Sequence, residues 1–309
     1  METGKNMEIL TIQNLQKSFG SKPVLRDVSF SVGEGSIFGF IGRNGAGKTT
    51  TMKIILGLLR ADGGNVRICN ETVTYGETST NRLIGYLPDV PEFYPYMRAK
   101  EYLRLCGEIT GLSGKELSVR IDELLGLVGL EKEKGKIGGY SRGMKQRLGI
   151  AQALIGRPKL LICDEPTSAL DPVGRHEILD ILLAAKEETS VLFSTHILSD
   201  VERISDHVAL LESGEVKASG VIEEMKAKRM ETGAGLVLKD REEAERIKKG
   251  FPEAQVSGGR IDFRELSADE ERRLFALLSE EMISVVRFER KEPDLEDLFM
   301  KAISGEENR

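Results

Sequence analysis

The sequence has little cysteine, no long apolar segment and no excess of positive charge. Its three cysteines, Cys69, Cys106 and Cys163, are odd in number and far apart, so the sequence indicates neither a disulfide framework nor a paired-cysteine metal site. A reducing compartment is therefore expected. No apolar run approaches the roughly 18 residues that a membrane-spanning helix needs. The first ten residues also lack the apolar centre of a secretory signal, so we expect any membrane role to depend on a partner.

The charge balance is acidic. Lys and Arg total 44 against 50 Asp and Glu, which gives a net charge of -6 and a pI near 5.5. This balance disfavours extensive binding to the phosphate backbone of a nucleic acid, so no nucleic-acid partner is predicted. With 309 residues, of which 40% are hydrophobic and 30% charged, the chain predicts a folded protein of about two domains.

The order of apolar patterns along the first part of the chain predicts an α/β fold with an antiparallel β region at its start. Alternating apolar and polar residues in 7–15 and 24–32 predict two paired strands. The apolar run at 37–42 predicts a buried strand that ends in a glycine-rich loop. Apolar residues at helical spacing in 50–59 predict the helix that follows this loop.

The remainder of the chain predicts a helical insertion, a parallel sheet and a second domain. Helical patterns dominate between about 92 and 155, which indicates a helical subdomain. Buried strands are expected at 159–166 and 189–196, with a helical pattern between them, the alternation typical of a parallel sheet. We expect this domain to cover 1–220, and a small α/β domain to occupy 221–309.

A glycine-rich loop predicts a nucleotide site. Residues 42–50 read GRNGAGKTT and fit the P-loop pattern between a predicted strand and a predicted helix. Glycines let backbone amides wrap phosphates closely, and the following helix points its unpaired amides at them. Lys48 is expected to reach the terminal phosphates and Thr49 to bind Mg²⁺, whereas a plain glycine-rich turn would not explain this Lys-Thr pair. The predicted nucleotide-contacting residues of the loop are Gly42, Arg43, Asn44, Gly45, Ala46, Gly47, Lys48, Thr49 and Thr50.

Two adjacent carboxylates follow an apolar strand in LLICDE, residues 160–165. A hard cation requires oxygen ligands, so Asp164 is predicted to bind Mg²⁺. A water that attacks phosphorus requires an acceptor, so Glu165 is predicted to act as the general base or to position that water. Alone, this pair would more often belong to a solvated turn. Together with a P-loop, the pair becomes a strong indication of these two roles.

Three further motifs occur in a fixed order: YSRGMKQR at 140–147, SALD at 168–171 and STH at 194–196. With the motifs above they resemble the ATP-binding subunits of ABC transporters, over about residues 1–220. The resemblance implies a P-loop NTPase fold with an ABC ATPase core, and ATP and Mg²⁺ as cofactors. It also implies a head-to-tail homodimer that closes on two ATP molecules and reopens after hydrolysis.

The same resemblance implies roles for residues outside the P-loop. Phe19 corresponds to the aromatic that stacks on adenine, and His196 to the residue that senses the γ-phosphate. Asp171 would sense the opposite subunit. The segment 141–143 would contact the ATP held by the partner chain, through Ser141, Arg142 and Gly143.

Each of these residues also has a simpler interpretation. Phe19 fits a buried core aromatic, because aromatic side chains are usually buried. His196 fits a hydrogen-bonded histidine at a strand end. Ser141 fits a helix N-cap, a role compatible with phosphate binding at the same helix end.

The sequence departs from the common family pattern at two places. The signature usually reads LSGGQ, but here it reads YSRGM, which resembles bacterial subunits that work with separate drug, antibiotic or cation-efflux permeases. Asp89 stands where the family usually has a glutamine after a strand. A carboxylate can still reach Mg²⁺ or a water, so Asp89 is predicted with Thr49 and Asp164 as a metal ligand, but it cannot donate a hydrogen bond as an amide does.

Two other segments have more than one interpretation. PDLEDLFMKAI at 293–303 resembles the closing helix of the accessory domain of efflux ATPases, and this domain is either a stabilising or dimer-supporting appendage or a regulator. The aromatic residues Phe93, Tyr94 and Tyr96 lie where the family receives a helix from its membrane partner. Packing within the helical insertion explains them equally well.

We therefore expect an ATP-hydrolysing subunit that drives a separate multi-helix membrane permease from the cytoplasmic face of the membrane, in the direction of export. One alternative is a mechanical ABC ATPase that acts on ribosomes or nucleic acid, against which the acidic charge counts. Another is a P-loop kinase, for which the three motifs after the P-loop would be accidental.

Overall fold

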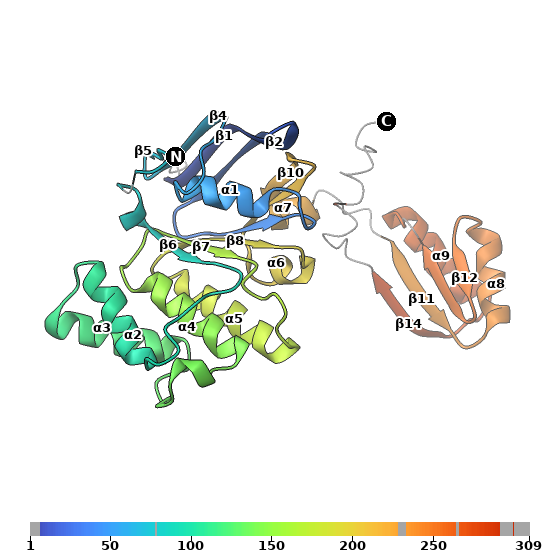
Figure 1. Ribbon diagram of the computed structural model, residues 1–309. Helices are drawn as coiled ribbons and strands as arrows, with labels where there is room; N and C mark the ends of the chain where they lie inside the picture. The colour runs from blue at the N-terminus through green and yellow to red at the C-terminus, as the bar shows by residue number, and fades with distance from the viewer. Residues whose placement is uncertain (1–6, 78, 228–232, 264–265, 291–298, 300–309) are drawn as a thin grey trace, which may run out of the picture. The chain divides into compact units, whose positions relative to one another are not determined.

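The structure, a computed structural model, describes residues 7–77, 79–227, 233–263, 266–290 and 299. The chain divides into two compact units, Met1–Ile222 and Glu223–Arg309, and each is described by itself (Figure 1). Within the described ranges, every helix is too short or too polar to cross a membrane.

The first unit is an α/β structure. Its strands are β1 (Glu8–Phe19), β2 (Lys22–Gly33), β3 (Ile37–Ile41), β4 (Gly63–Ile68), β5 (Glu71–Thr72), β6 (Ile84–Leu87), β7 (Leu160–Asp164), β8 (Ser190–Thr195), β9 (His207–Glu212) and β10 (Glu215–Val221). They form a ten-stranded sheet in the order β5-β4-β1-β2-β10-β9-β3-β8-β7-β6. The helices of this unit are α1 (Lys48–Ile55), α2 (Ala99–Ile109), α3 (Gly114–Leu127), α4 (Arg142–Leu154), α5 (Pro172–Ala185) and α6 (Leu198–Ile204). A short helix, α7 (Ile222–Ala227), begins at the boundary between the two units.

The N-terminal part of this sheet is antiparallel. β1 pairs with β2, so that Ile12 lies opposite Phe30, and it pairs on its other side with β4. The predicted pair of strands is thus confirmed. The sequence did not predict the β4–β5 hairpin, whose turn places Cys69 and Asn70 at φ 48° and 65°. Its outer strand has only two residues, too few to show an alternating pattern.

The central part of the sheet is parallel, as predicted. β3 pairs with β8 and β9, and β7 pairs with β6 and β8, all in parallel. Every residue of β3, β7 and β8 is buried, which explains the apolar runs IFGFI, LLIC and VLF within these strands. Figure 1 shows α1 on one side of β6–β8 and α4 and α5 on the other. The carboxyl ends of β3, β7 and β8 therefore meet at one edge of the sheet.

The helix after β3 is shorter than predicted. The apolar pattern suggested a helix over 50–59, but α1 ends at Ile55. Gly57 takes the left-handed φ of 68°, and its amide donates to the Ile54 carbonyl while the Leu58 amide donates to that of Lys53. This pair of hydrogen bonds is a Schellman cap, which only a residue tolerant of positive φ closes easily. The helical spacing of the following leucines did not reveal it.

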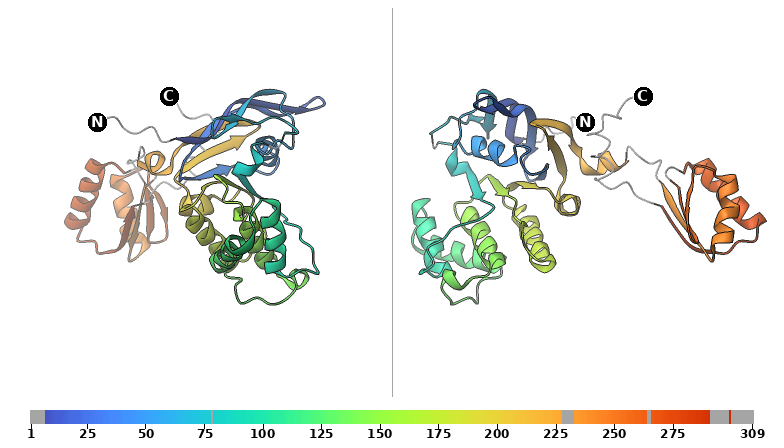
Figure 2. Two further views of the ribbon diagram at one scale, coloured as in Figure 1. Left: turned by 90° about the vertical axis from the view of Figure 1, so that its left-hand side faces the viewer. Right: turned by 45° about the vertical axis from the view of Figure 1, so that its right-hand side comes forward.

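The predicted helical insertion consists of α2, α3 and α4 (Figure 2). A buried arginine joins these helices to the rest of the unit. Arg120 in α3 is 2% exposed, and its Nη2 donates to the Leu154 carbonyl at 2.9 Å. The same guanidinium pairs with Glu188, 2.8 Å away, in the turn after α5. The hydrogen bond from Arg120 lowers the pKa of the Glu188 carboxyl below its usual value.

The second unit is a smaller α/β structure. It contains β11 (Ala234–Leu238), α8 (Arg241–Gly250), β12 (Gln255–Ser257), β13 (Arg260–Phe263), α9 (Ala268–Glu280) and β14 (Val285–Arg290). The strands form an antiparallel sheet in the order β12-β13-β11-β14. Leu236 and Ile261 from the sheet share its buried core with Ile247 and Leu274 from the helices. The predicted closing helix at 293–303 lies outside the described residues except for Phe299.

We expect Arg120→Ala to lower the free energy of unfolding by about 2–3 kcal/mol, because the Leu154 carbonyl loses its partner and the buried stem leaves a cavity. Lys100→Ala is the matched control, since it breaks only the exposed pair with Asp122 and costs less than about 1 kcal/mol. Denaturant titration measures both.

The low pKa of Glu188 makes the Arg120 effect pH-dependent. The Glu188 carboxylate contributes stability above its unfolded pKa of about 4.3, and this contribution is lost as the pH falls through its lower folded pKa. The stability gap between wild type and Arg120→Ala should therefore narrow in strongly acidic solution. An equal gap from neutral to acidic pH would contradict the ion pair.

Candidate functional site

The loop between β3 and α1 has a shape that only glycine permits at certain positions. Gly45 and Gly47 take φ values of 84° and 117°. A Cβ on Gly47 would lie 2.5 Å from Leu25 Cδ2, and one on Gly42 would lie 2.5 Å from the Leu211 carbonyl oxygen. The loop thus lies directly against β2 and β9. This close approach accounts physically for the glycine pattern of 42–50.

Lys48, the first residue of α1, lies at the centre of this loop. Its side chain is almost fully buried, and its Nζ donates to the Gly42 carbonyl at 2.6 Å and to the Arg43 carbonyl at 3.4 Å. The same ammonium lies 3.1 Å from Glu165 Oε1. A buried ammonium requires such partners. Lys48 is therefore held where it can face either the carboxylate or phosphate oxygens.

A cavity of about 490 Å³ brings together residues that lie far apart in the sequence. It is lined by Val24, Asn44, Gly45, Gly47, Lys48, Thr49, Thr50, Asp89, Asp164, Glu165, Ser168 and His196. The remaining predicted loop residues, Gly42, Arg43 and Ala46, shape the loop: the first two accept from Lys48, and the Ala46 amide donates to the Arg43 carbonyl.

Asp164 is fixed by a serine that the sequence did not single out. Asp164 ends β7 and is buried, and the hydroxyl of Ser194 in β8 donates to its Oδ1 at 2.6 Å. The amide of Glu165 donates to the same hydroxyl at 3.0 Å. Ser194 therefore fixes both predicted carboxylates. Its position in the STH motif was the available signal, but only His196 was assigned a role there.

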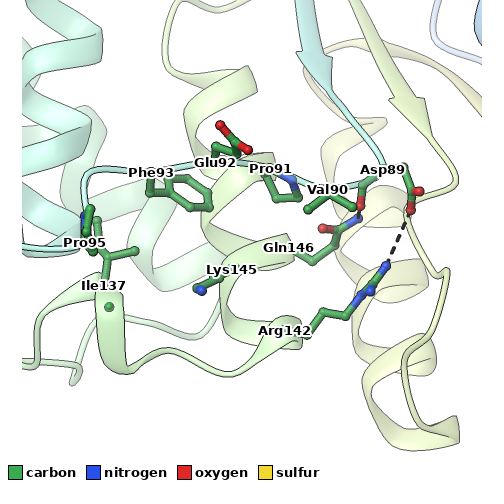
Figure 3. A pocket seen from close by; sticks show the side chains of 11 residues that line it. Asp89, Val90, Pro91, Glu92, Phe93, Pro95, Ile137, Arg142, Lys145 and Gln146 are labelled. Atoms are coloured by element: carbon green, nitrogen blue, oxygen red, sulfur yellow. Dashed lines mark hydrogen bonds and ion pairs between the residues drawn. The ribbon is translucent and has the colours of Figure 1, made fainter.

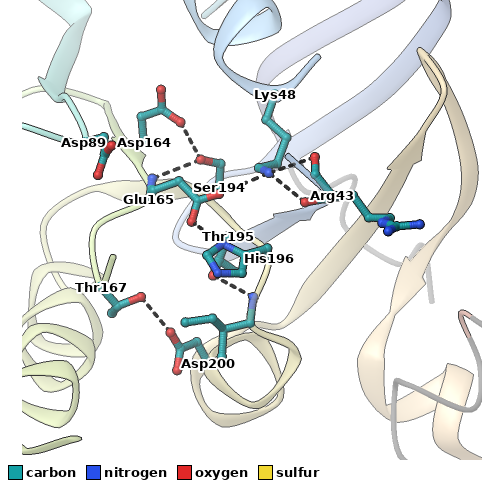
Figure 4. Close-up of polar contacts among 12 residues, drawn as sticks. Arg43, Lys48, Asp89, Asp164, Glu165, Thr167, Ser194, Thr195, His196 and Asp200 are labelled. Carbon is teal, nitrogen blue, oxygen red and sulfur yellow. Dashed lines mark hydrogen bonds and ion pairs between the residues drawn. The ribbon is translucent and has the colours of Figure 1, made fainter. Parts of the chain in front are cut away.

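Glu165 lies between a cation and an imidazole (Figure 4). Its Oε2 is 2.9 Å from His196 Nδ1, and its Oε1 is 3.1 Å from Lys48 Nζ. Oε1 is buried and makes no hydrogen bond of ordinary geometry, so it can still accept one. The backbone of Glu165 takes φ 49°, a left-handed value that is uncommon for residues other than glycine. This conformation turns the side chain from the strand end toward the P-loop.

The donor set fits Mg²⁺ bound together with a nucleotide. Mg²⁺ in proteins usually has one or two carboxylate ligands and completes its shell with phosphate oxygens and water. Thr49 and Asp164 line the same cavity and supply a hydroxyl and a carboxylate. Over the described part of the chain, no group of three or more His, Cys, Asp or Glu forms a metal cage of its own.

Phe19 is not a core residue. Its ring, at the end of β1, is 52% exposed, so the alternative of a buried core aromatic is wrong. The ammonium of Lys17 lies 5.5 Å from the ring centroid. Phe19 is not among the residues that line the P-loop cavity. An exposed aromatic face is available for stacking, and its contact with adenine stays a prediction.

The signature segment does not line the P-loop cavity of its own chain, although Arg142 pairs with Asp89 in the wall of that cavity. The Ser141 hydroxyl accepts from the Met144 amide at 3.2 Å and so caps α4, as the simpler interpretation expected. Asp171 caps α5 in the same way by accepting from the Gly174 amide at 2.9 Å. Neither residue, nor Arg142 or Gly143, lines the P-loop cavity. Their contact with a nucleotide from another chain stays a prediction.

The two departures from the family pattern face each other. Asp89 Oδ1 lies 3.5 Å from Arg142 Nη2 in a half-exposed ion pair. Asp89 lines the P-loop cavity and also a groove of about 440 Å³ beside α4 (Figure 3). The groove is lined by Asp89, Val90, Pro91, Glu92, Phe93, Pro95, Ile137, Gly138, Arg142, Lys145 and Gln146. Since its carboxylate faces Arg142, the metal role of Asp89 stays a prediction.

The aromatic cluster before α2 has two different environments. Phe93 lines the groove and also packs edge-on against Tyr102 of α2, with ring centroids 5.2 Å apart. The rings of Tyr94 and Tyr96 are tilted against each other, 5.8 Å apart, and these residues are 50% and 66% exposed. Tyr94 also packs edge-on against Tyr102, with ring centroids 6.2 Å apart. Phe93 and Tyr94 therefore both pack against α2, while the two tyrosines also present aromatic surface to solvent.

A comparison with known proteins identifies this arrangement. A family profile described as ABC transporter matches residues 25–168. The Uncharacterized ABC transporter ATP-binding protein YxlF of Bacillus subtilis is 39% identical over 300 residues, covering 96% of this chain and 99% of that protein. The chain belongs to the ABC transporter ATP-binding proteins. The resemblance inferred from the motifs is confirmed.

Other relatives support the same assignment. The bacitracin transport ATP-binding protein BcrA of Bacillus licheniformis is 35% identical and covers 96% of this chain and 98% of that protein. A solved ATP-binding subunit of an ABC transporter matches with a TM-score of 0.64 and 35% identity, over 71% of this chain and 92% of that one. The predicted P-loop NTPase fold with an ABC ATPase core is confirmed. Members of this family hydrolyse ATP to power transport, and this chain is an ATPase.

We expect Ser194→Ala to lower ATP turnover by about 10- to 100-fold and to raise the Mg²⁺ concentration for half-maximal rate, because Asp164 loses the bond that orients it. Ser190→Ala removes a buried hydroxyl at the opposite end of β8, which contacts the Gly35 amide, and should leave turnover nearly unchanged. A Mg²⁺ titration of the steady-state rate measures both. Equal Mg²⁺ dependence in wild type and Ser194→Ala would contradict this role.

Proposed function

We propose that this chain binds Mg-ATP in the P-loop cavity and hydrolyses it to drive a separate membrane permease. The contact that carries the proposal is the Glu165 carboxylate held between Lys48 and His196 at the edge of that cavity. Phosphoryl transfer to water is promoted by a cation near the phosphates, a group that accepts the proton of the attacking water, and hydrogen-bond donors to the phosphate oxygens. The three side chains supply these functions in one place.

The proposed chemistry assigns one task to each group. Lys48 shifts from Glu165 to the γ-phosphate oxygens, and Glu165 accepts a proton from the water that attacks phosphorus. The bond from phosphorus to the bridging oxygen of ADP breaks as the new bond to the water oxygen forms. Thr49 and Asp164 would hold Mg²⁺ beside the phosphates, where the ion would supply positive charge to the phosphate oxygens. His196 donates to the γ-phosphate, and Phe19 stacks on adenine.

We infer that two copies act together, head to tail. Ser141 is exposed and Gly143 is partly exposed, and neither lines the P-loop cavity of its own chain. Their position is consistent with a contact to the nucleotide that the second copy binds. The free amides at the start of α4 suit a γ-phosphate. Arg142 adds positive charge beside them, and Asp171 faces the other subunit. Because these contacts require the γ-phosphate, hydrolysis removes the affinity that keeps the dimer closed.

The groove beside α4 is proposed as the permease docking site. It combines apolar Phe93, Pro91 and Ile137 with charged Lys145, a lining suited to an amphipathic helix. Tyr94 and Tyr96, which are exposed, are sequence neighbours of two residues of the groove, Phe93 and Pro95. Docking places the chain at the cytoplasmic face of the membrane as a peripheral subunit, with no nucleic-acid partner.

Export is the proposed direction, and 221–309 the proposed accessory domain. The name of BcrA refers to bacitracin transport, and the linearmycin resistance ATP-binding protein LnrL of Bacillus subtilis is 36% identical over 69% of this chain. The match to BcrA extends over 96% of this chain and therefore includes the second unit. We propose that this unit stabilises the dimer and contains no catalytic residue.

Glu165→Gln tests the catalytic core of the proposal. We expect the variant to bind ATP normally but to turn over at least about 100-fold more slowly, since an amide does not accept the proton. With ATP and Mg²⁺ it should accumulate as a dimer by light scattering. Lys48→Ala is the control that should lose ATP binding and remain monomeric. Normal turnover in Glu165→Gln would remove Glu165 from its assigned role.

Lys145→Glu tests the docking groove. Reversing this charge should weaken co-purification with a multi-helix membrane protein by about 10-fold or more, because a like-charge contact at an interface costs several kcal/mol. The ATP affinity of the chain alone should not change. Lys115→Glu, on the exposed surface of α3 outside the groove, is the matched control. Retention of RNA in a salt-sensitive manner, without any membrane protein, would favour the mechanical ATPase instead.

A further inference from the structure

Asp200 is a buried carboxylate with a partner for each of its oxygens. It lies in the first turn of α6 and is only 2% exposed. Thr167 Oγ1 donates to its Oδ2 at 2.7 Å, and Arg175 Nη2 donates to its Oδ1 at 2.5 Å. Charged side chains are rarely buried unless they are paired and hydrogen-bonded. This junction therefore requires that three elements be placed accurately with respect to one another.

Asp200 and its partner Thr167 each follow one of the two residues that meet in the cavity, His196 and Glu165. Thr167 lies two positions after Glu165, in the loop from β7 to α5. Asp200 lies four positions after His196, where β8 continues into α6. Figure 4 shows the Thr167–Asp200 bond close to the Glu165–His196 contact, joining the same two segments. The two segments are thus joined inside the cavity and again outside its lining, in addition to the bond from the Glu165 amide to Ser194 in β8.

The loop after Glu165 requires an external constraint. Glu165 and Ala169 both take left-handed φ values, 49° and 52°. Such conformations of residues other than glycine cost about 1–3 kcal/mol and persist only when surrounding contacts determine them. Within the loop, the Ser168 amide donates to the Glu165 carbonyl. The side-chain bond from Thr167 to Asp200 ties the middle of this strained turn to α6.

We propose that Asp200 is a positioning residue for ATP hydrolysis. Through Thr167 and Arg175 it keeps the Glu165 loop and the His196 loop in register, so that Glu165 Oε2 and His196 Nδ1 remain in contact. The proposal rests on the proposed role of Glu165. Asp200 does not line the P-loop cavity, so its loss affects catalysis through the placement of Glu165 and leaves the nucleotide contacts of Lys48 and Thr49 in place.

The test compares kcat and KM for Mg-ATP in the full-length chain. Asp200→Asn keeps the size of the side chain but cannot accept from Thr167 and Arg175 at both positions. We expect kcat to fall about 10- to 100-fold with KM within twofold, since small misplacements of catalytic groups cost about that much. Asp180→Asn is the matched control, because Asp180 in α5 pairs with Arg203 in α6 at 2.8 Å on the exposed side of the same two helices. Its kcat should change less than twofold.

Two threonine variants keep the test decisive if Asp200→Asn folds poorly. Thr167→Val removes only the hydroxyl, and should lower kcat with KM unchanged. Thr167→Ser restores the hydroxyl and should return kcat to within about threefold of wild type. The proposal would be overturned if Thr167→Val had a lower melting temperature but an unchanged kcat at temperatures well below thermal unfolding. In that case the bond between Thr167 and Asp200 would only stabilise the fold.

A double variant separates this inference from the proposed function. If Asp200 acts through Glu165, Glu165→Gln/Asp200→Asn should be no slower than Glu165→Gln alone, because effects through one residue are not additive. A further 10-fold loss in the double variant would overturn the positioning role. If Glu165→Gln is slow but Asp200→Asn and Thr167→Val are not, only this inference fails. Normal turnover in Glu165→Gln would overturn both.

Discussion

The carboxylate of Glu165 lies between Lys48 and His196, which come from distant parts of the chain. They meet because β3, β8 and β7 are neighbours in a parallel sheet and present their carboxyl ends at one edge. All three strands are buried along their whole length, so a slip in register would shift apolar side chains as well as the catalytic groups. The geometry of the site is therefore a consequence of how the core packs.

Hydrogen bonds between buried polar groups also fix the positions of the residues around the cavity. Asp164 is held by Ser194, which also receives the Glu165 amide, and Asp200 is held by Thr167 and Arg175. In the low-polarity interior, a buried polar group without a partner lowers the stability of the fold. When all of its hydrogen bonds are formed, those bonds are stronger than they would be in water. The hydroxyl groups of Ser194 and Thr167 carry no charge. They restrict where the charged side chains can lie.

Much of this architecture could be predicted from the sequence, because the buried strands and the P-loop have local patterns with a physical cause. Glycine at 42, 45 and 47 reflects close backbone approach and positive φ, and the apolar runs reflect burial on both faces of the sheet. Ser194 and Asp200 were missed, since a single serine or aspartate has no periodicity and its partner lies about thirty residues away. The exposure of Phe19 and the end of α1 at Ile55 also depend on neighbours and on cap geometry that composition does not encode.

Asp89 belongs to the walls of two cavities at once, the one beside the P-loop and the groove beside α4. The Asp89 side chain would therefore contact a ligand in either cavity. If a ligand in one cavity moves the Asp89 side chain, the affinity of the other cavity changes as well, and this coupling acts equally in both directions. An affinity measured at either cavity should therefore be compared with its neighbour empty and with its neighbour filled.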